Sequence, residues 1–238
     1  MACQHILMKN FICFSAYALA HFFISLCFIL PAAHAEISTS NITINTVIND
    51  EKTIHDINLT KATNLVLDSE EFSLQPVTTG LRKKKFFALV NVKFYFAELL
   101  AASPQKIIKT ETDILTSLKA AGPVEMKLTL FRDVPNDQLI NYFTEAFNAN
   151  SIFEPSYSAA MKLFFEELKS IKQLNKNDVF SLIGLWKKDK TILVLQRPDK
   201  TIKTIEGDVQ FLNQIYSVWF GEPADDKTKA LKKDFLKN

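Results

Sequence analysis

Four adjacent cations, Arg82-Lys83-Lys84-Lys85, are the side chains of this sequence best suited to hold a carboxylate or a phosphate. Arg82 is the strongest candidate, because a guanidinium grips an anion through two parallel hydrogen bonds and the chain has only two other arginines, Arg132 and Arg197. Lysines beside a strand also have a simpler role, since solvated charges discourage strands of different molecules from pairing. The sequence favours this simpler role for the run and leaves Arg82 as the candidate anion contact.

The remaining reactive side chains form no recognisable catalytic set. All three cysteines lie in the first 35 residues, and His55 is the only histidine after them, in a polar stretch without a nucleophile at a familiar spacing. No glycine opens a nucleophile elbow, a phosphate loop or a dinucleotide turn. We therefore predict no metal, no cofactor and no thiol chemistry, and we interpret His55 as a surface residue. Three acidic pairs are interpreted as solvated: Glu70-Glu71, Glu166-Glu167 and Asp225-Asp226.

Residues 1–35 have the features of a secretory signal peptide. Lys9 is their only charged side chain, an apolar stretch runs from Phe11 to Leu30, and the small-residue pattern Ala33-His34-Ala35 follows. We predict cleavage after Ala35, which would place the protein in the periplasm or outside the cell.

Two other interpretations of residues 1–35 compete with a cleaved signal. The apolar stretch approaches the roughly 20 residues that span a bilayer, so a retained transmembrane anchor is the rival to cleavage. A lipoprotein signal is disfavoured because Leu26, and not a small residue, precedes Cys27. No later apolar run is long enough to cross a membrane, so we expect no membrane span once the signal is removed.

The chain after residue 35 is close to electrically neutral. The first 35 residues hold one of the 28 basic side chains and none of the 26 acidic ones, so the other 203 residues carry a formal net charge of +1. Nucleic acid is disfavoured as a partner, because phosphate binding requires a concentrated basic surface. Without cysteines the segment must be stabilised by its core, and its length suffices for one. We predict a single domain over residues 36–238.

Periodicity predicts an α+β domain, in which helices cover one face of an antiparallel sheet. Apolar residues at every second position predict strands, and apolar residues three or four apart predict helices. Residues 36–80 are expected to be largely irregular, with short β-stretches at 42–48, 54–59 and 65–67. Further strands are predicted around 88–96 and at 124–130, 179–186, 191–197 and 201–205, and helices at 114–118, 139–147, 157–171 and 208–221.

Three segments resemble the signatures of the bacterial secreted chalcone isomerase-like proteins. They are Gly80-Leu81-Arg82-Lys83-Lys84 leading into Phe86 to Phe96, then Leu128 to Val134, and finally Trp219 to Lys227. This resemblance implies an open-faced β-sandwich, a large antiparallel sheet covered by a layer of helices. It also implies a cleft between the sheet and the helices, where plant members close a flavanone ring.

The resemblance carries the four family active-site positions onto Thr79, Val90, Leu139 and Ala146. The plant enzymes have an arginine, a threonine, a tyrosine and an asparagine there, and this sequence keeps none of these side chains. Ring closure needs hydrogen-bond donors where negative charge develops, and losing one such donor costs about 10²-fold or more. We therefore expect an apolar cleft without this catalysis, with Arg82 as the only nearby cation that could replace the arginine.

Three hypotheses about function remain open. The first is a non-catalytic module that binds a fatty acid or another small apolar ligand, as other branches of the superfamily do. The second is a structural or assembly protein of the cell envelope with a filled core and no ligand. The third is an isomerase, an intramolecular lyase acting on an unknown substrate. The phenylalanines of the segment would suit a pocket and a packed core equally.

Overall fold

The computed structural model describes residues 41–86 and 90–237. An eight-stranded antiparallel sheet dominates this part of the chain, in the order β1-β2-β3-β4-β5-β8-β9-β10, and β6 pairs with β7 in a small second sheet. The strands are β1 (Ile42–Ile54), β2 (Ile57–Leu67), β3 (Glu70–Phe86), β4 (Val90–Ala101), β5 (Val124–Leu130), β6 (Val134–Pro135), β7 (Gln173–Leu174), β8 (Val179–Trp186), β9 (Thr191–Gln196) and β10 (Ile202–Gly207). The helices are α1 (Ile114–Ser117), α2 (Asn136–Ala149), α3 (Ala159–Lys169), α4 (Phe211–Phe220) and α5 (Asp226–Lys237), with 3₁₀ turns at Pro104–Lys106, Leu118–Ala121 and Glu154–Ser156.

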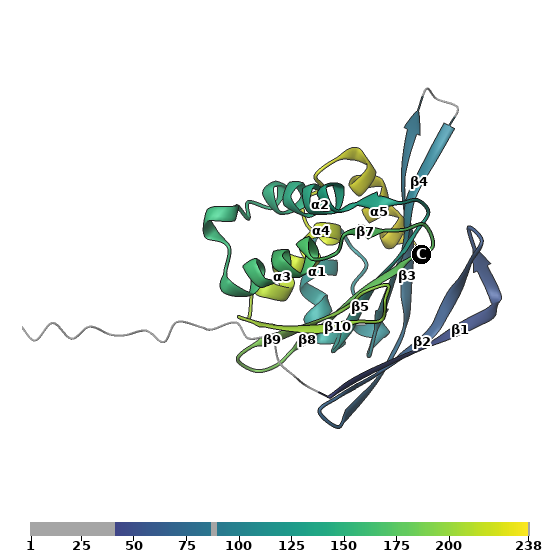
Figure 1. Cartoon of the computed structure of the whole chain (residues 1–238). Coiled ribbons are helices and arrows are strands. Elements are labelled where there is room, and N and C mark those ends of the chain that lie inside the picture. Colours follow the sequence, from purple (N-terminus) through teal and green to yellow (C-terminus); the bar gives the residue numbers. More distant parts are fainter. Residues whose placement is uncertain (1–40, 87–89, 238) are drawn as a thin grey trace, which may run out of the picture. The chain divides into compact units, whose positions relative to one another are not determined.

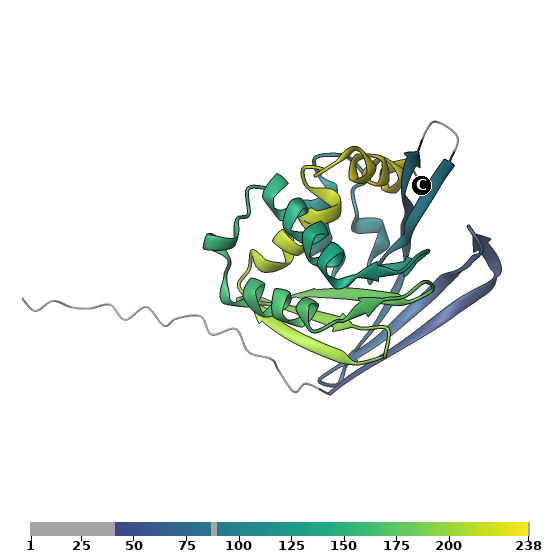
Figure 2. The same ribbon diagram turned by 45° about the horizontal axis from the view of Figure 1, so that its top comes forward.

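The sheet curls into a half-barrel, and the two views show the helices grouped on one of its faces (Figures 1 and 2). The main core lies between that face and the helices, and it contains Phe143, Phe164 and Trp219. A smaller core lies on the other face, where Leu65 and Leu67 of β2 belong to one cluster with residues of β8 and β9. The predicted α+β architecture, with helices on one face of an antiparallel sheet, is confirmed.

The prediction of a largely irregular N-terminal region was wrong, because β1, β2 and the first half of β3 are long strands. The predicted β-stretches at 42–48 and 65–67 do lie in β1 and β2, whereas 54–59 spans the turn between them. Two tight turns join them, with positive φ at His55 and Asp56 and again at Asp68 and Ser69. Consecutive left-handed residues make the two-residue turns whose twist suits a hairpin, and His and Asp tolerate that conformation better than most residues. Exposed apolar residues, Val47 and Ile48, and buried polar ones, Thr60 and Thr63, had hidden the alternation of β1 and β2.

The helices α1 to α4 lie where the periodicity predicted them. Asp113 donates its backbone N–H to the Thr110 hydroxyl at 3.1 Å, and that hydroxyl donates to the Asp113 carboxylate at 2.7 Å, before α1 begins. Gly122, with φ of 82°, ends the turn that follows α1, a conformation that glycine adopts without strain. None of the helices described within 41–86 and 90–237 combines the length and apolar character that a bilayer crossing requires.

Helix α5 was missed, and it packs directly against β3. Its sequence is mostly charged, with Leu231 and Phe235 as buried apolar residues four positions apart. Gly80 of β3 makes this contact possible, since a Cβ atom there would lie 2.5 Å from the Leu231 Cδ1 atom. The Thr78 hydroxyl donates to the Phe235 carbonyl at 2.9 Å. Helix α5 therefore fixes the stretch of β3 that carries Arg82.

Candidate functional site

A pocket of about 360 Å³ lies between the sheet and the helices. Its wall is apolar over most of its extent and is built from β4, β5, β8 and α2. The apolar side chains come from residues that alternate toward the helix layer on each strand and from one stripe of α2. The principal ones are Phe94, Leu128, Leu130, Leu139, Phe143 and Phe180.

Charged and phenolic groups meet at one part of the wall. Arg82 is 8% exposed, and its guanidinium contacts Asp225 at 3.1 and 3.3 Å, with a further hydrogen bond to the Thr228 hydroxyl. The Tyr142 ring lies over the guanidinium, with 4.5 Å between its centroid and the Arg82 Cζ atom. Such stacking suits arginine and holds the planar group in one orientation.

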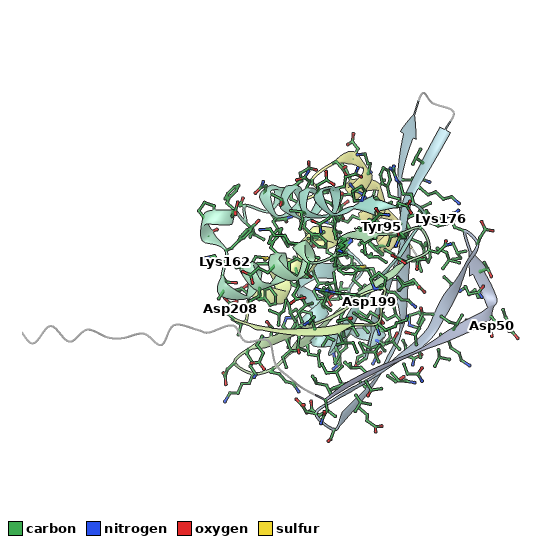
Figure 3. The ribbon with its side chains drawn as sticks, in the orientation of Figure 1. Asp50, Tyr95, Lys162, Lys176, Asp199 and Asp208 are labelled. Carbon is green, nitrogen blue, oxygen red and sulfur yellow. The ribbon has the colours of Figure 1, made fainter. Side chains whose placement is uncertain are left out.

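The hydroxyls of Tyr95 and Tyr142 are 2.7 Å apart, and the indole N–H of Trp219 donates to Tyr95 at 3.3 Å. Tyr95 lies between the sheet and the helices, as Figure 3 shows. Each phenol carries one proton, and the bond between the two hydroxyls uses only one of them. One phenolic O–H therefore remains to donate to a ligand oxygen, whichever tyrosine supplies it.

A β-bulge in the β3–β4 ladder shapes this site. Arg82 pairs with Tyr95, and the next residue of β3, Lys83, pairs with Lys93, so Phe94 is passed over in the register. Consecutive strand residues normally point to opposite faces, and a bulge changes that locally. This explains how both Phe94 and Tyr95 line the same pocket.

The site keeps a charged pair beside neutral phenols. Burial is the largest influence on both tyrosines, and it raises the pKa of Tyr95 and, more strongly, that of Tyr142. Burial opposes the charge of Arg82, yet Tyr142, Tyr95 and Asp225 outweigh it and raise the pKa of the guanidinium. Burial also disfavours the Asp225 carboxylate, but the Thr228 N–H and Arg82 hold its pKa well below the usual range. At neutral pH the phenols are hydrogen-bond donors and the pair is ionised.

The residues singled out from the sequence are partly assembled here. Arg82 and Leu139 line the pocket. Thr79 lies on β3 opposite Glu98, and Ala146 is buried in the main core; neither belongs to the described lining. Val90 begins β4 opposite Phe86, and its side chain lies outside the described part of the chain.

Sequence reasoning missed Tyr95, Tyr142 and Asp225. Regular pairing of β3 with β4 would have placed Phe94 opposite Arg82, and only the bulge brings Tyr95 there. Tyr142 lies three positions after Leu139 on the same side of α2. The solvated interpretation of Asp225 was wrong, because this carboxylate forms an ion pair with Arg82. His55 is exposed, as expected. No three His, Cys, Asp or Glu side chains among the described residues form a group that could hold a metal ion.

The comparisons with known proteins agree with this geometry. The sequence profile described as chalcone isomerase-like matches residues 51–236. The chain belongs to the chalcone isomerase-like family. Among solved structures it is similar to a fatty-acid binding protein of Arabidopsis thaliana, with 17% identity, a TM-score of 0.55, and coverage of 81% of this chain and 96% of that one. No curated protein matches the sequence. At this identity the structural match establishes the fold alone.

Proposed function

We propose that this chalcone isomerase-like protein binds a fatty acid, or a closely similar single-chain amphiphile, in the pocket between sheet and helices. The observation that carries the proposal is the meeting of the Arg82 guanidinium with the Tyr95–Tyr142 pair on the wall of an otherwise apolar pocket. The polar groups would hold the head group, and the apolar wall would enclose the chain.

Arg82 and the two tyrosines keep hydrogen-bond donors that no described residue of the protein uses. A guanidinium has five N–H groups, and the bonds to Asp225 and Thr228 use three of them. The remaining N–H groups and the free phenolic proton are the donors that a carboxylate accepts most strongly. Lys227 and Glu145 also line the pocket, and Lys227 contacts Asp225 at 3.1 Å, so at the head-group site two cations, Arg82 and Lys227, share the one Asp225 carboxylate.

The apolar wall suits an alkyl chain. Each methylene group that leaves water contributes about 0.8 kcal/mol, so a short enclosed segment already contributes several kcal/mol. A pocket of about 360 Å³ lies within the usual range for small-ligand sites, roughly 300–1,000 Å³. The similar plant structure is described as a fatty-acid binding protein, which supports the proposal by analogy of fold.

Displacement of a fluorescent fatty acid tests the proposal. We expect Arg82→Ala to weaken binding about tenfold or more, because a hydrogen-bonded charge contributes roughly 1.5–3 kcal/mol. Tyr142→Phe should weaken it less, since the ring over Arg82 remains. Arg197→Ala is the matched control, as Arg197 pairs with Glu167 away from the pocket. Failure of the unmodified protein to bind fatty acids, or to rise in melting temperature with them, would instead favour the structural, ligand-free hypothesis.

A second candidate function is isomerisation of the intramolecular lyase type. It is favoured by one observation: a guanidinium, two phenols and the amide-bearing Asn141 line the same pocket. These donors could polarise an enone oxygen, although they do not occupy the positions that the family resemblance indicated. Accelerated ring closure of a chalcone over the spontaneous rate, abolished in Tyr95→Phe, would support this candidate.

We further propose that the protein acts in the periplasm or outside the cell after removal of residues 1–35, as a bacterial secreted protein. This rests on the sequence of that segment, which lies outside the described residues. The intact mass of the protein recovered from the periplasm or the medium tests it, with Glu36 as the expected first residue. A full-length mass in the membrane fraction would favour the anchor.

A further inference from the structure

We infer that the end of the sheet beside the pocket is a docking surface for an anionic lipid bilayer. This surface, here named the basic end, consists of Lys83, Lys93, Phe94, Phe131 and Arg132. The inference deepens the proposed function, on which it rests: a protein that takes up an alkyl-chain ligand must meet the membranes in which such molecules dissolve.

Like charges face each other at the basic end. Lys83 of β3 and Lys93 of β4 are directly paired in the antiparallel register. Opposed like charges destabilise a strand pair, so fold stability does not account for them. Lys84 and Lys85 follow in the sequence, and no acidic residue occurs between Glu71 and Glu98. This concentration of positive charge is complementary to an anionic surface.

Aromatic rings are interleaved with these cations. The Lys93 ammonium lies 5.1 Å from the centroid of the Phe131 ring, and the Arg132 guanidinium carbon lies 5.3 Å from that of Phe94. A hydrogen bond of 2.9 Å from the Phe131 N–H to the Phe94 carbonyl ties the two layers together. Cations with apolar stems beside aromatic rings suit the boundary between lipid head groups and acyl chains.

The cations lie on both sides of the strands. Arg132 contacts Phe94, which lines the pocket. Burial is the first cause of the lowered pKa of His55 in the β1–β2 turn, and Lys93 and Lys83 lie close enough to lower it further. Asp56 and Asp234 are acidic groups near that histidine and offset part of the positive charge. Asp133 is engaged by the Lys176 N–H at 2.8 Å.

The basic end is also placed where a ligand would need it. Lys83 immediately follows Arg82, and Lys93 immediately precedes Phe94 and Tyr95, so the lysines lie one residue beyond the pocket lining. In both views the end of β3 and the start of β4 project past the helices at this end (Figures 1 and 2). Docking end-on would bring the pocket next to the bilayer surface.

Flotation of the secreted chain with lipid vesicles tests the inference. One set of vesicles contains phosphatidylglycerol in phosphatidylcholine, and the other contains phosphatidylcholine alone. The test variant is Lys83→Gln/Lys93→Gln/Arg132→Gln. The matched control, Lys119→Gln/Lys162→Gln/Lys188→Gln, removes the same charge at exposed positions, and Figure 3 shows Lys162 at the side of the helices away from the hairpin. A fluorescent fatty acid is titrated into each protein in vesicle-free solution as a separate readout.

We expect the unmodified protein and the control to bind the anionic vesicles, with binding lost in high salt. The test variant should partition about 100-fold more weakly, at roughly fivefold for each cation removed, while its affinity for the dissolved fatty acid stays unchanged. Equal binding of the two variants would overturn the inference, as would tighter binding to a DNA duplex than to the vesicles. Vesicle docking without fatty-acid binding would overturn the proposed ligand and leave the docking surface standing.

Discussion

The two faces of the sheet both bury charged residues, but they do so in different ways. On the helix side, Arg82 and Asp225 form an ion pair on the wall of a pocket, and the Asp225 side chain is 27% exposed. On the other face, Glu98, Glu125 and Lys127 are nearly inaccessible to solvent beneath β2. The Arg82–Asp225 pair is accessible from the pocket. Glu98, Glu125 and Lys127, here called the closed group, have almost no access to solvent.

The closed group is stabilised by contacts between strands. The Glu98 carboxylate accepts the Thr60 N–H at 2.8 Å and the Thr60 hydroxyl at 3.1 Å, and the Lys127 ammonium donates to the same hydroxyl at 2.7 Å. These bonds hold β2 over β4 and β5. Buried charges thus line a pocket on one face, where we propose that they recognise a ligand, and hold β2 over β4 and β5 on the other.

The largest expected effect is that of Glu98→Ala. Its removal leaves the Thr60 N–H without its acceptor and takes away one of the two buried carboxylates, Glu98 and Glu125, that accompany Lys127. Breaking such a buried group costs about 3–5 kcal/mol. Urea unfolding would measure the loss, and fatty-acid binding of the folded protein should be unchanged. Glu98→Gln keeps an acceptor and should lose less. A loss below about 1 kcal/mol for the alanine variant would show that water enters the closed group.

Asp225→Ala is expected to lower the stability of the fold and to raise the affinity for a fatty acid. Asp225 caps α5 by accepting the Thr228 N–H at 2.7 Å, and losing a helix cap costs about 1–2 kcal/mol. The same change frees Arg82 donors for a ligand carboxylate, so affinity for a fatty acid should rise by about fivefold, equivalent to about 1 kcal/mol for a hydrogen bond. Thermal unfolding and fluorescent displacement measure the two effects.

The neighbouring Asp226→Ala is the control, because it removes the same charge from an exposed position. It should leave the affinity unchanged. If Asp225→Ala weakened fatty-acid binding instead, Asp225 would be positioning Arg82 for the ligand and not competing for it.

The helix-side elements were largely predictable from the sequence, and the far face was not. Helix α2 and strand β5 bury one clean apolar stripe, which periodicity detects. Strands β1 and β2 place polar residues between the apolar ones and depend on two turns whose left-handed residues carry no glycine signal. The buried group of Glu98, Glu125 and Lys127 could not be predicted either. Charged residues on a strand are expected at the surface unless another strand covers them, and the full length of β2 was not predicted.

The candidate site was predictable only in part. Arg82 was identified from its side-chain type alone. Tyr95 could be found only from the β3–β4 register with its bulge. Asp225 could be found only by predicting α5, whose buried apolar residues are too few for periodicity to detect. The family resemblance correctly predicted a cleft between the sheet and the helices. The donors in the pocket nevertheless come from Tyr95 and Tyr142 and not from the positions that the resemblance indicated.

The two faces should also respond to pH in opposite directions. The pKa of Asp225 is lowered, so its contribution to stability is present above the ordinary value of 3.8 and is lost as the pH falls through the lowered one. The pKa of Glu125 is raised, chiefly by burial. Its contribution is therefore full below the ordinary value of 4.5 and is lost as the pH rises through the raised one.

Glu125→Gln is expected to have the smallest effect on stability and the clearest effect on its pH dependence. The Ser181 hydroxyl donates to Glu125 at 2.8 Å, while the other carboxylate oxygen and the Thr63 hydroxyl are buried close to each other without a well-formed hydrogen bond. A neutral amide could keep the Ser181 bond and donate toward Thr63, which would stabilise the protein by about 1 kcal/mol at neutral pH.

Urea unfolding at several pH values between 4 and 8 would measure this change, with Glu71→Gln as the control because Glu71 is exposed. The free energy of unfolding of Glu125→Gln should fall less than that of the unmodified protein as the pH rises, since the amide has no proton to lose. A parallel pH profile would mean that Glu125 is not the group that titrates beneath β2. In that case the opposition between the two faces would rest on Asp225 alone.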